Sequence, residues 1–141
     1  MAQAPPQSTL TFRPAVAMAE GQQFLRHSLQ YHGRSIIAPT VLRLARPLLS
    51  AASVQAASEV TVTLAAFPGG AGVSVVADLH EQATQATPTL AHVAGVTQVT
   101  MAGSSNWGTA AEGYTSSAWF EVAPSSLVRH VLSEARLQLV S

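Results

Sequence analysis

Two β-branched runs separated by a glycine-rich turn constrain the fold of this chain more than any other feature. Residues 59–64 (EVTVTL) and 73–79 (VSVVADL) alternate in the manner of strands, and residues 67–72 (FPGGAG) have the composition of a turn. Two such runs joined by a short turn pair as antiparallel neighbours. The sequence therefore predicts a central β-hairpin.

The hairpin carries two specific expectations. Strand alternation predicts that Val62 and Val75 face the interior of the protein. Gly69 and Gly70 are expected to form the turn, because glycine adopts the backbone angles that tight turns require.

Shorter alternating runs predict most of the other strands. They are residues 9–13, 24–33, 35–44, 96–101, 117–122 and 136–140. For the second of these runs, a helix from Ala15 to Leu29 is the alternative, because good helix formers surround Gly21. One or two helical turns are predicted within residues 47–57, and a short helix after Ser126 as its N-cap. Residues 103–113, which include Trp107, are predicted to form a loop.

Seven or eight short strands with little helix indicate a mostly β protein, an antiparallel β-sandwich or jelly roll with one or two short helices. The 141 residues fit one domain. We expect residues 1–8, rich in proline and glutamine, to be a flexible arm and residues 9–141 to be the single sandwich domain. Thr9 to Arg13 has the alternation needed to cover an open sheet edge, in its own subunit or in a neighbour.

Missing residue types exclude several kinds of catalytic site. All seven basic residues are arginine and cysteine is absent. A P-loop lysine, a Schiff-base lysine, a thiolate nucleophile and a cysteine-bound zinc are therefore excluded. The five histidines show no HxH or HExxH spacing.

One serine–aspartate–histidine grouping has the residue types of a hydrolase site. Asp78 and His80 lie two residues apart on one strand, with Ser74 nearby, but no nucleophile elbow surrounds the serine. Side chains at i and i+2 also point outward in parallel. We predict that the chain is not an enzyme and has no catalytic residues, no metal site and no cofactor.

The low charge content favours large buried interfaces. Only 10% of the residues are charged and 48% are hydrophobic, and interface cores are depleted in charge; a compositional bias of the genome is the alternative. We predict interface roles for Thr9, Leu10, Phe12 and Trp107. Trp107, Tyr114, Trp119 and Phe120 are expected in the core or an interface, with a stacking platform for sugar or single-stranded nucleic acid as the alternative.

The N-terminal third is modestly basic. It contains five arginines, and Glu20 is its only acidic residue. We predict that Arg13, Arg26 and Arg34 face nucleic acid, with an ordinary solvated face as the alternative. The chain as a whole has a formal net charge of zero, which argues against tight binding to duplexes.

From about Val54 onward, the order of segments resembles the coat proteins of tymoviruses and related small icosahedral plant viruses. The likeness consists of EVTVTL, the FPGG turn, GVSVVADL, a polar loop ending in TPTL, VTQVTMAG, WFEVAP, a short helix with Arg129, and ARLQLV. The resemblance implies a jelly roll of two sheets, many copies of which close an icosahedral shell around weakly and pH-sensitively held single-stranded RNA. The last jelly-roll strand would then be missing or supplied elsewhere.

These observations lead us to expect a structural coat protein that associates with itself in many copies and contacts single-stranded RNA weakly. A phage head-decoration or tail protein and a β-sandwich ligand- or sugar-binding module are the alternatives. No apolar run is long enough to span a membrane, and the first residues lack the pattern of a signal peptide. We therefore expect a soluble product located in the virion or the host cytoplasm.

Overall fold

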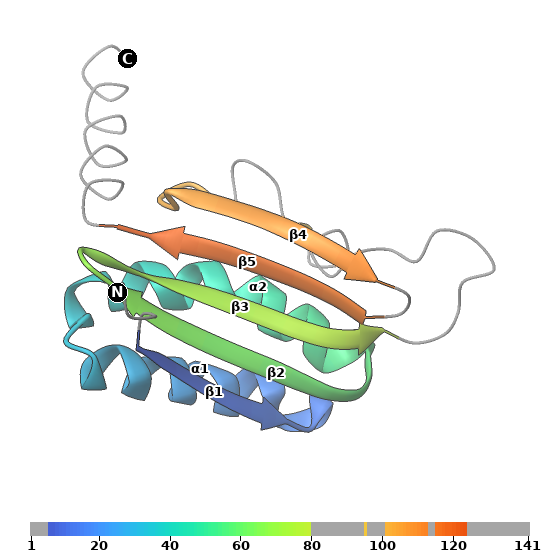
Figure 1. Ribbon diagram of the computed structural model, residues 1–141. Coiled ribbons are helices and arrows are strands. Elements are labelled where there is room, and N and C mark those ends of the chain that lie inside the picture. Colours follow the sequence, from blue (N-terminus) through green and yellow to red (C-terminus); the bar gives the residue numbers. More distant parts are fainter. Residues whose placement is uncertain (1–5, 80–94, 96–100, 113–114, 124–141) are drawn as a thin grey trace, which may run out of the picture.

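The computed structural model describes residues 6–79, 95, 101–112 and 115–123. In these residues, two helices cover one face of a five-stranded antiparallel sheet (Figure 1). Its strands lie in the order β1-β2-β3-β5-β4. They are β1 (Gln7–Phe12), β2 (Ala56–Phe67), β3 (Gly70–Leu79), β4 (Asn106–Glu112) and β5 (Thr115–Val122), and the helices are α1 (Pro14–Tyr31) and α2 (Ala38–Gln55), with the 3₁₀ helix η1 (Ser35–Ile37) between them.

The predicted central hairpin is confirmed. Val62 of β2 pairs with Val75 of β3, and both are fully buried beneath the helices. The turn lies one residue earlier than predicted, because Phe67 pairs with Gly70 and leaves Pro68 and Gly69 as the loop. Gly69 has a φ of 81°, as the third position of a type II turn requires, and proline suits the position before it.

Truncating Val75 to alanine is expected to lower the free energy of unfolding by about 1–3 kcal/mol, because the methyl groups leave a filled core. The neighbouring Val76 points to the opposite, partly exposed face of β3. Val76→Ala should therefore lower the free energy of unfolding clearly less than Val75→Ala. Urea denaturation of both variants measures the difference. Equal losses would contradict the assignment of the two faces.

The predicted strand at residues 24–33 is wrong, and the alternative helix is confirmed as part of α1. The buried residues of α1 include Ala17, Gly21, Leu25 and Leu29, which recur at the helical spacing of about 3.6 residues. The strand alternation would have buried His27 and Tyr31 with the two leucines, but both are exposed. Helical burial of one face therefore prevails over the short alternating pattern.

The predicted strand at residues 35–44 is also wrong. Its first part forms η1, and the remainder begins α2. Pro39 lies in the first turn of α2, where the missing N–H of proline has no helical partner to lose. The residues of α2 that pack on the sheet and on α1 recur at helical spacing: Val41, Leu44, Ala45, Leu48, Leu49 and Ala52. Helix was correctly predicted within residues 47–57, up to Gln55.

Gln7 and Ser8, predicted as the end of a flexible N-terminal arm, belong to β1; residues 1–5 lie outside the described part. β1 pairs with β2 of its own chain, from Gln7 opposite Ala65 to Phe12 opposite Val60. Pairing of this strand with a sheet edge of its own subunit, one of the two predicted arrangements, is therefore possible within a single chain, and pairing with a neighbour stays a prediction.

The last third of the described chain holds one prediction that is confirmed and one that is wrong. The strand at residues 117–122 is confirmed within β5, whereas the predicted loop at residues 103–113 contains β4. Met101, predicted as a strand end, lies in a turn. Residues 96–100, the helix after Ser126 and the strand at residues 136–140 lie outside the described part.

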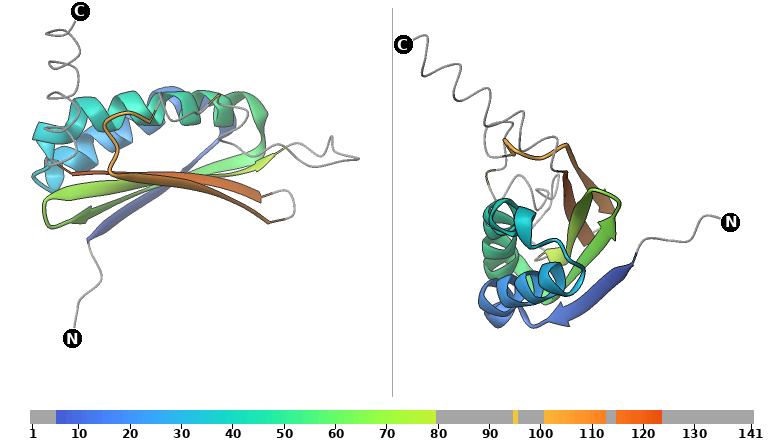
Figure 2. Two further views of the ribbon diagram at one scale, coloured as in Figure 1. Left: turned by 90° about the horizontal axis from the view of Figure 1, so that it is seen from above. Right: turned by 90° about the vertical axis from the view of Figure 1, so that its left-hand side faces the viewer.

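The fold is rich in antiparallel sheet, as predicted, but its second layer consists of helices. Within the described residues there is one sheet, and its other face is left uncovered (Figure 2). The second sheet of a sandwich or jelly roll is not seen in this part of the chain. The core lies between the sheet and the helices, where Phe120, Leu25 and Leu64 are among the largest fully buried side chains.

Candidate functional site

The layer of helices carries all the basic side chains of the described residues. They come from the residue before α1, from α1 itself, from the α1–α2 connection and from α2, and are Arg13, Arg26, Arg34, Arg43 and Arg46. Glu20 is the only acidic residue in this layer. Four of the five arginines are exposed, and Arg34 is half-buried.

The sheet carries the remaining acidic side chains of the described residues and no basic one. They are Glu59, Asp78, Glu112 and Glu121. Asp78 and Glu112 both pair with Thr115, and Glu121 pairs with Gly72. Because Val73, Val75 and Ala77 point into the core, strand alternation turns Asp78, Glu112 and Glu121 to the uncovered face.

The described part is therefore a plate with a basic helical side and an acidic sheet side, although the chain is neutral overall. Electrostatics favours anionic groups near the helical side over the open sheet face. This separation of charge is the feature with the clearest chemical meaning in the structure.

Arg34 has a structural task within this layer. Its guanidinium donates hydrogen bonds to the carbonyl oxygens of His32, Phe67 and Gly70, at 2.9, 2.9 and 3.0 Å. These bonds tie the α1–α2 connection to the β2–β3 turn. Its role toward nucleic acid stays a prediction, but these donors already serve the fold.

The other predicted phosphate contacts, Arg13 and Arg26, have exposed side chains. Arg43 and Arg46, which belong to the basic N-terminal third but were not predicted to face nucleic acid, are also exposed, on α2. Arg43 donates to the carbonyl oxygen of Ala102 at 2.6 Å. The sequence signal for this surface is a helical spacing of polar residues on α2. The residues are all exposed and are Pro39, Arg43, Arg46 and Ser50.

The four predicted interface residues lie in different environments. Thr9 is exposed, and its hydroxyl lies 3.1 Å from that of Thr63. Leu10 is 48% exposed, which leaves it available to a partner. Phe12 is buried against Phe24, with ring centroids 6.0 Å apart, so it is a core residue in this structure.

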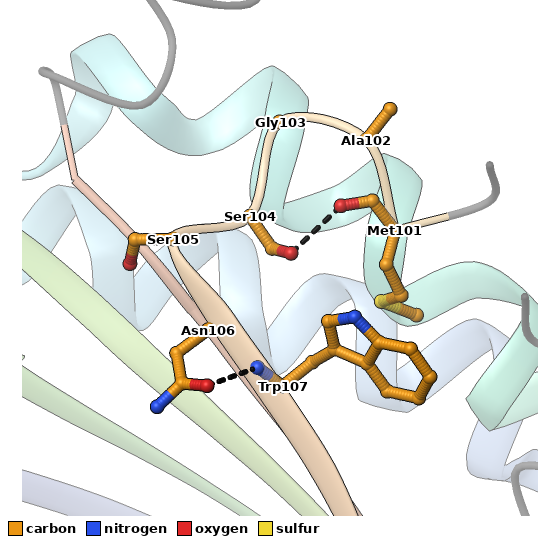
Figure 3. Close-up of a pocket in the computed structure, with 7 residues that line it drawn as sticks. All are labelled: Met101, Ala102, Gly103, Ser104, Ser105, Asn106 and Trp107. Atoms are coloured by element: carbon orange, nitrogen blue, oxygen red, sulfur yellow. Dashed lines mark hydrogen bonds between the residues drawn. The ribbon is translucent and has the colours of Figure 1, made fainter. Parts of the chain in front are cut away.

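Trp107 is partly buried and packs against the core. Figure 3 shows its ring beside Met101, in a pocket of about 310 Å³ lined by residues 101–107. Two of the polar groups there are bonded within the segment: the Ser104 hydroxyl donates to the Met101 carbonyl at 2.7 Å, and the Asn106 side-chain oxygen accepts from the backbone N–H of Trp107 at 3.0 Å. None of the lining residues is charged, and the Ser104 hydroxyl and the Asn106 side-chain oxygen are already hydrogen-bonded within the segment.

The aromatic platform considered as an alternative does not form in the described residues. Trp107 pairs with the buried Phe120, whereas Trp119 pairs with Gly108 and lies on the uncovered face. The two tryptophans are therefore on opposite sides of the sheet. A Cβ at Gly108 would lie 2.6 Å from the Trp119 ring, which explains the glycine. Tyr114 lies outside the described part.

The grouping around Asp78 is a cross-strand hydrogen-bond cluster. The carboxylate accepts from the Ser58 and Thr115 hydroxyls, both at 3.0 Å. Ser74 lies four residues before Asp78 on the same face of β3, and His80 lies outside the described residues. In the part of the chain that the structure describes, no three potential metal ligands gather.

Comparisons with known proteins do not add a family to this picture. No protein-family model matches the chain, and no curated protein matches it in sequence. Among the described helices, none combines the length and hydropathy needed to cross a bilayer.

Proposed function

We propose that this chain is a structural subunit that assembles in many copies, with its helical layer turned toward a polyanionic cargo. A coat around single-stranded RNA is the form of assembly that the resemblance to tymovirus coat proteins implies. The jelly roll and the icosahedral shell remain predictions from that resemblance.

The observation that carries the proposal is the separation of charge between the two sides of the plate. A subunit of a closed shell must present different chemistry to its contents and to the outside. The exposed Arg26, Arg43 and Arg46 suit the inner side, because phosphate binding depends on such contacts. The acidic residues of the sheet suit the outer side, since they would repel the cargo.

The uncovered sheet face supports assembly in a second way. The interior of this face is uncharged: Thr61, Thr63, Ser74, Val76 and Ser117 are partly buried and Thr11 is exposed. Low charge is the property that interface cores share. Of the alternatives, the sugar-binding module loses its support, because Trp107 and Trp119 do not face the same side.

Sedimentation velocity and electron microscopy of the purified protein, with and without RNA, test the assembly itself. Particles of megadalton size are the expected result. A strictly monomeric protein under all these conditions would overturn the proposal.

Neutralising the helical face tests its orientation toward the cargo. The double variant Arg26→Gln with Arg46→Gln is expected to bind a fluorescent oligouridine less tightly. Loss of two phosphate contacts should make the negative slope of log K, where K is the binding constant, against log salt concentration less steep by about 1.4. Fluorescence anisotropy over a series of salt concentrations measures this slope.

The matched control removes the same net charge from the opposite side. Ala65→Glu with Ala110→Glu adds two acids to the uncovered face, so it should leave the slope unchanged. If the control made the slope less steep by as much as the arginine variant does, net charge and not the helical face would govern binding.

A further inference from the structure

β1 is an edge strand whose outer backbone groups can be identified from its pairing with β2. The carbonyl oxygen of Pro6 accepts a hydrogen bond from the Ala66 N–H at 2.9 Å, so position 6 directs its backbone group toward β2. In an antiparallel pair this direction alternates from residue to residue. Positions 8, 10 and 12 therefore bond to β2, and Gln7, Thr9 and Thr11 direct their N–H and C=O groups away from the sheet.

This edge lacks the devices that usually prevent strands from pairing with other chains. β1 contains no charged residue and no proline, and its register with β2 has no bulge. Charges, prolines and bulges are the common protections of natural sheet edges. None of the described residues bonds to the outward backbone groups of β1.

An exposed apolar side chain lies beside the same edge. Leu10 points to the helical side of the sheet and is 48% exposed. It lines a hollow between β1 and α1, together with Phe12, Phe24, Glu20 and His27. A strand added to β1 would cover Leu10 as well as satisfying the backbone.

We propose that β1 forms an antiparallel pair with β1 of a second copy of this chain. The two copies are related by a two-fold axis that runs perpendicular to the sheet, between the two Thr9 residues. The two five-stranded sheets then form one continuous sheet. This inference rests on the proposed function, in that it names one contact by which the subunits associate.

Self-complementarity of the edge is the reason to name a second copy as the occupant. With Thr9 on the axis, Thr9 faces Thr9 of the second copy, and Gln7 faces Thr11 of the second copy. Every outward N–H and C=O group of these residues then has a partner. The pairing also extends an existing ladder of threonines, since Thr9 and Thr11 already lie 3.1 Å from Thr63 and Thr61 by their hydroxyls.

Opposite charges at position 9 test the axis directly, because this residue is predicted to meet its own copy. Thr9→Lys and Thr9→Glu should each weaken association at least about tenfold, since identical charges would stand opposite each other. An equimolar mixture of the two variants should associate again. Sedimentation velocity over a range of concentrations measures the association of each variant and of their mixture. Circular dichroism confirms that each variant is folded.

The matched control is Thr63→Lys, which places the same charge beside Thr9 on the adjacent strand but not at the edge. It should associate like the original protein. If the Thr9 variants associate normally, edge pairing is overturned while self-association stands. If the mixture fails to associate, the axis at Thr9 is overturned. If the original protein is always monomeric, both this contact and the proposed function are overturned.

Discussion

Replacing Phe120 by alanine is expected to lower the free energy of unfolding by about 3–5 kcal/mol, because it empties a large part of a packed core. Phe120 is fully buried in β5, between Val73 of β3 and Trp107 of β4. The cavity lies at the centre of the sheet, where hydrogen-bonded strands on both sides restrict collapse. Urea denaturation measures the loss.

The control for this variant is the adjacent Trp119→Ala. Trp119 is the larger side chain, but it lies on the uncovered face and is partly exposed. Trp119→Ala should therefore lower the free energy of unfolding by less than Phe120→Ala. The opposite ranking would mean that the uncovered face is buried in the folded protein, which would make it an interface.

Arg34→Met is expected to lower the free energy of unfolding by about 2–4 kcal/mol. The variant keeps most of the apolar stem but removes hydrogen bonds to three carbonyl oxygens, and bonds from a charged donor are worth more than neutral ones. Thermal and urea denaturation both measure this loss.

Arg26→Met is the matched control, because Arg26 is an exposed residue of α1. Its effect on stability should stay within about 0.5 kcal/mol. If both variants had equally small effects, the three bonds of Arg34 would not contribute to stability, and its predicted role toward nucleic acid would regain weight.

The part of the fold that was predictable from sequence is the part whose pattern is local. β2 and β3 are long β-branched runs joined by a turn with proline and glycine, so both strands and their pairing follow from neighbouring residues. α1 was harder, because Leu25, His27, Leu29 and Tyr31 fit a strand over seven residues. Only a window reaching back to Ala17 reveals the helical period of its buried side.

β4 was missed for a different reason. Its Asn-Trp-Gly-Thr sequence and the preceding serines have the composition of a loop, and only pairing with β5 makes it a strand. Gly108 weakens the local preference for strand but leaves space for the Trp119 ring. The lower strand propensity of Gly108 is thus explained by its close approach to the Trp119 ring, which sequence alone does not show.

The candidate site was predictable only as a composition. The excess of arginine in the N-terminal third was visible, but its concentration on one side of a plate required the helices to be known. Arg34 could not be separated from the exposed arginines, because two of its three partners, Phe67 and Gly70, lie more than thirty positions away in the chain.

The position of β1 in the chain has a consequence for the order of folding. Its threonines meet their partners in β2 across sequence separations of 50 and 54 residues, whereas β2 and β3 meet across a two-residue turn. Closing the longer loop costs more chain entropy, so we expect β1 to dock on β2 after the β2–β3 hairpin has formed. Until β1 docks, β2 is a free edge of the sheet, and β1 of a second chain can pair with it in the same place.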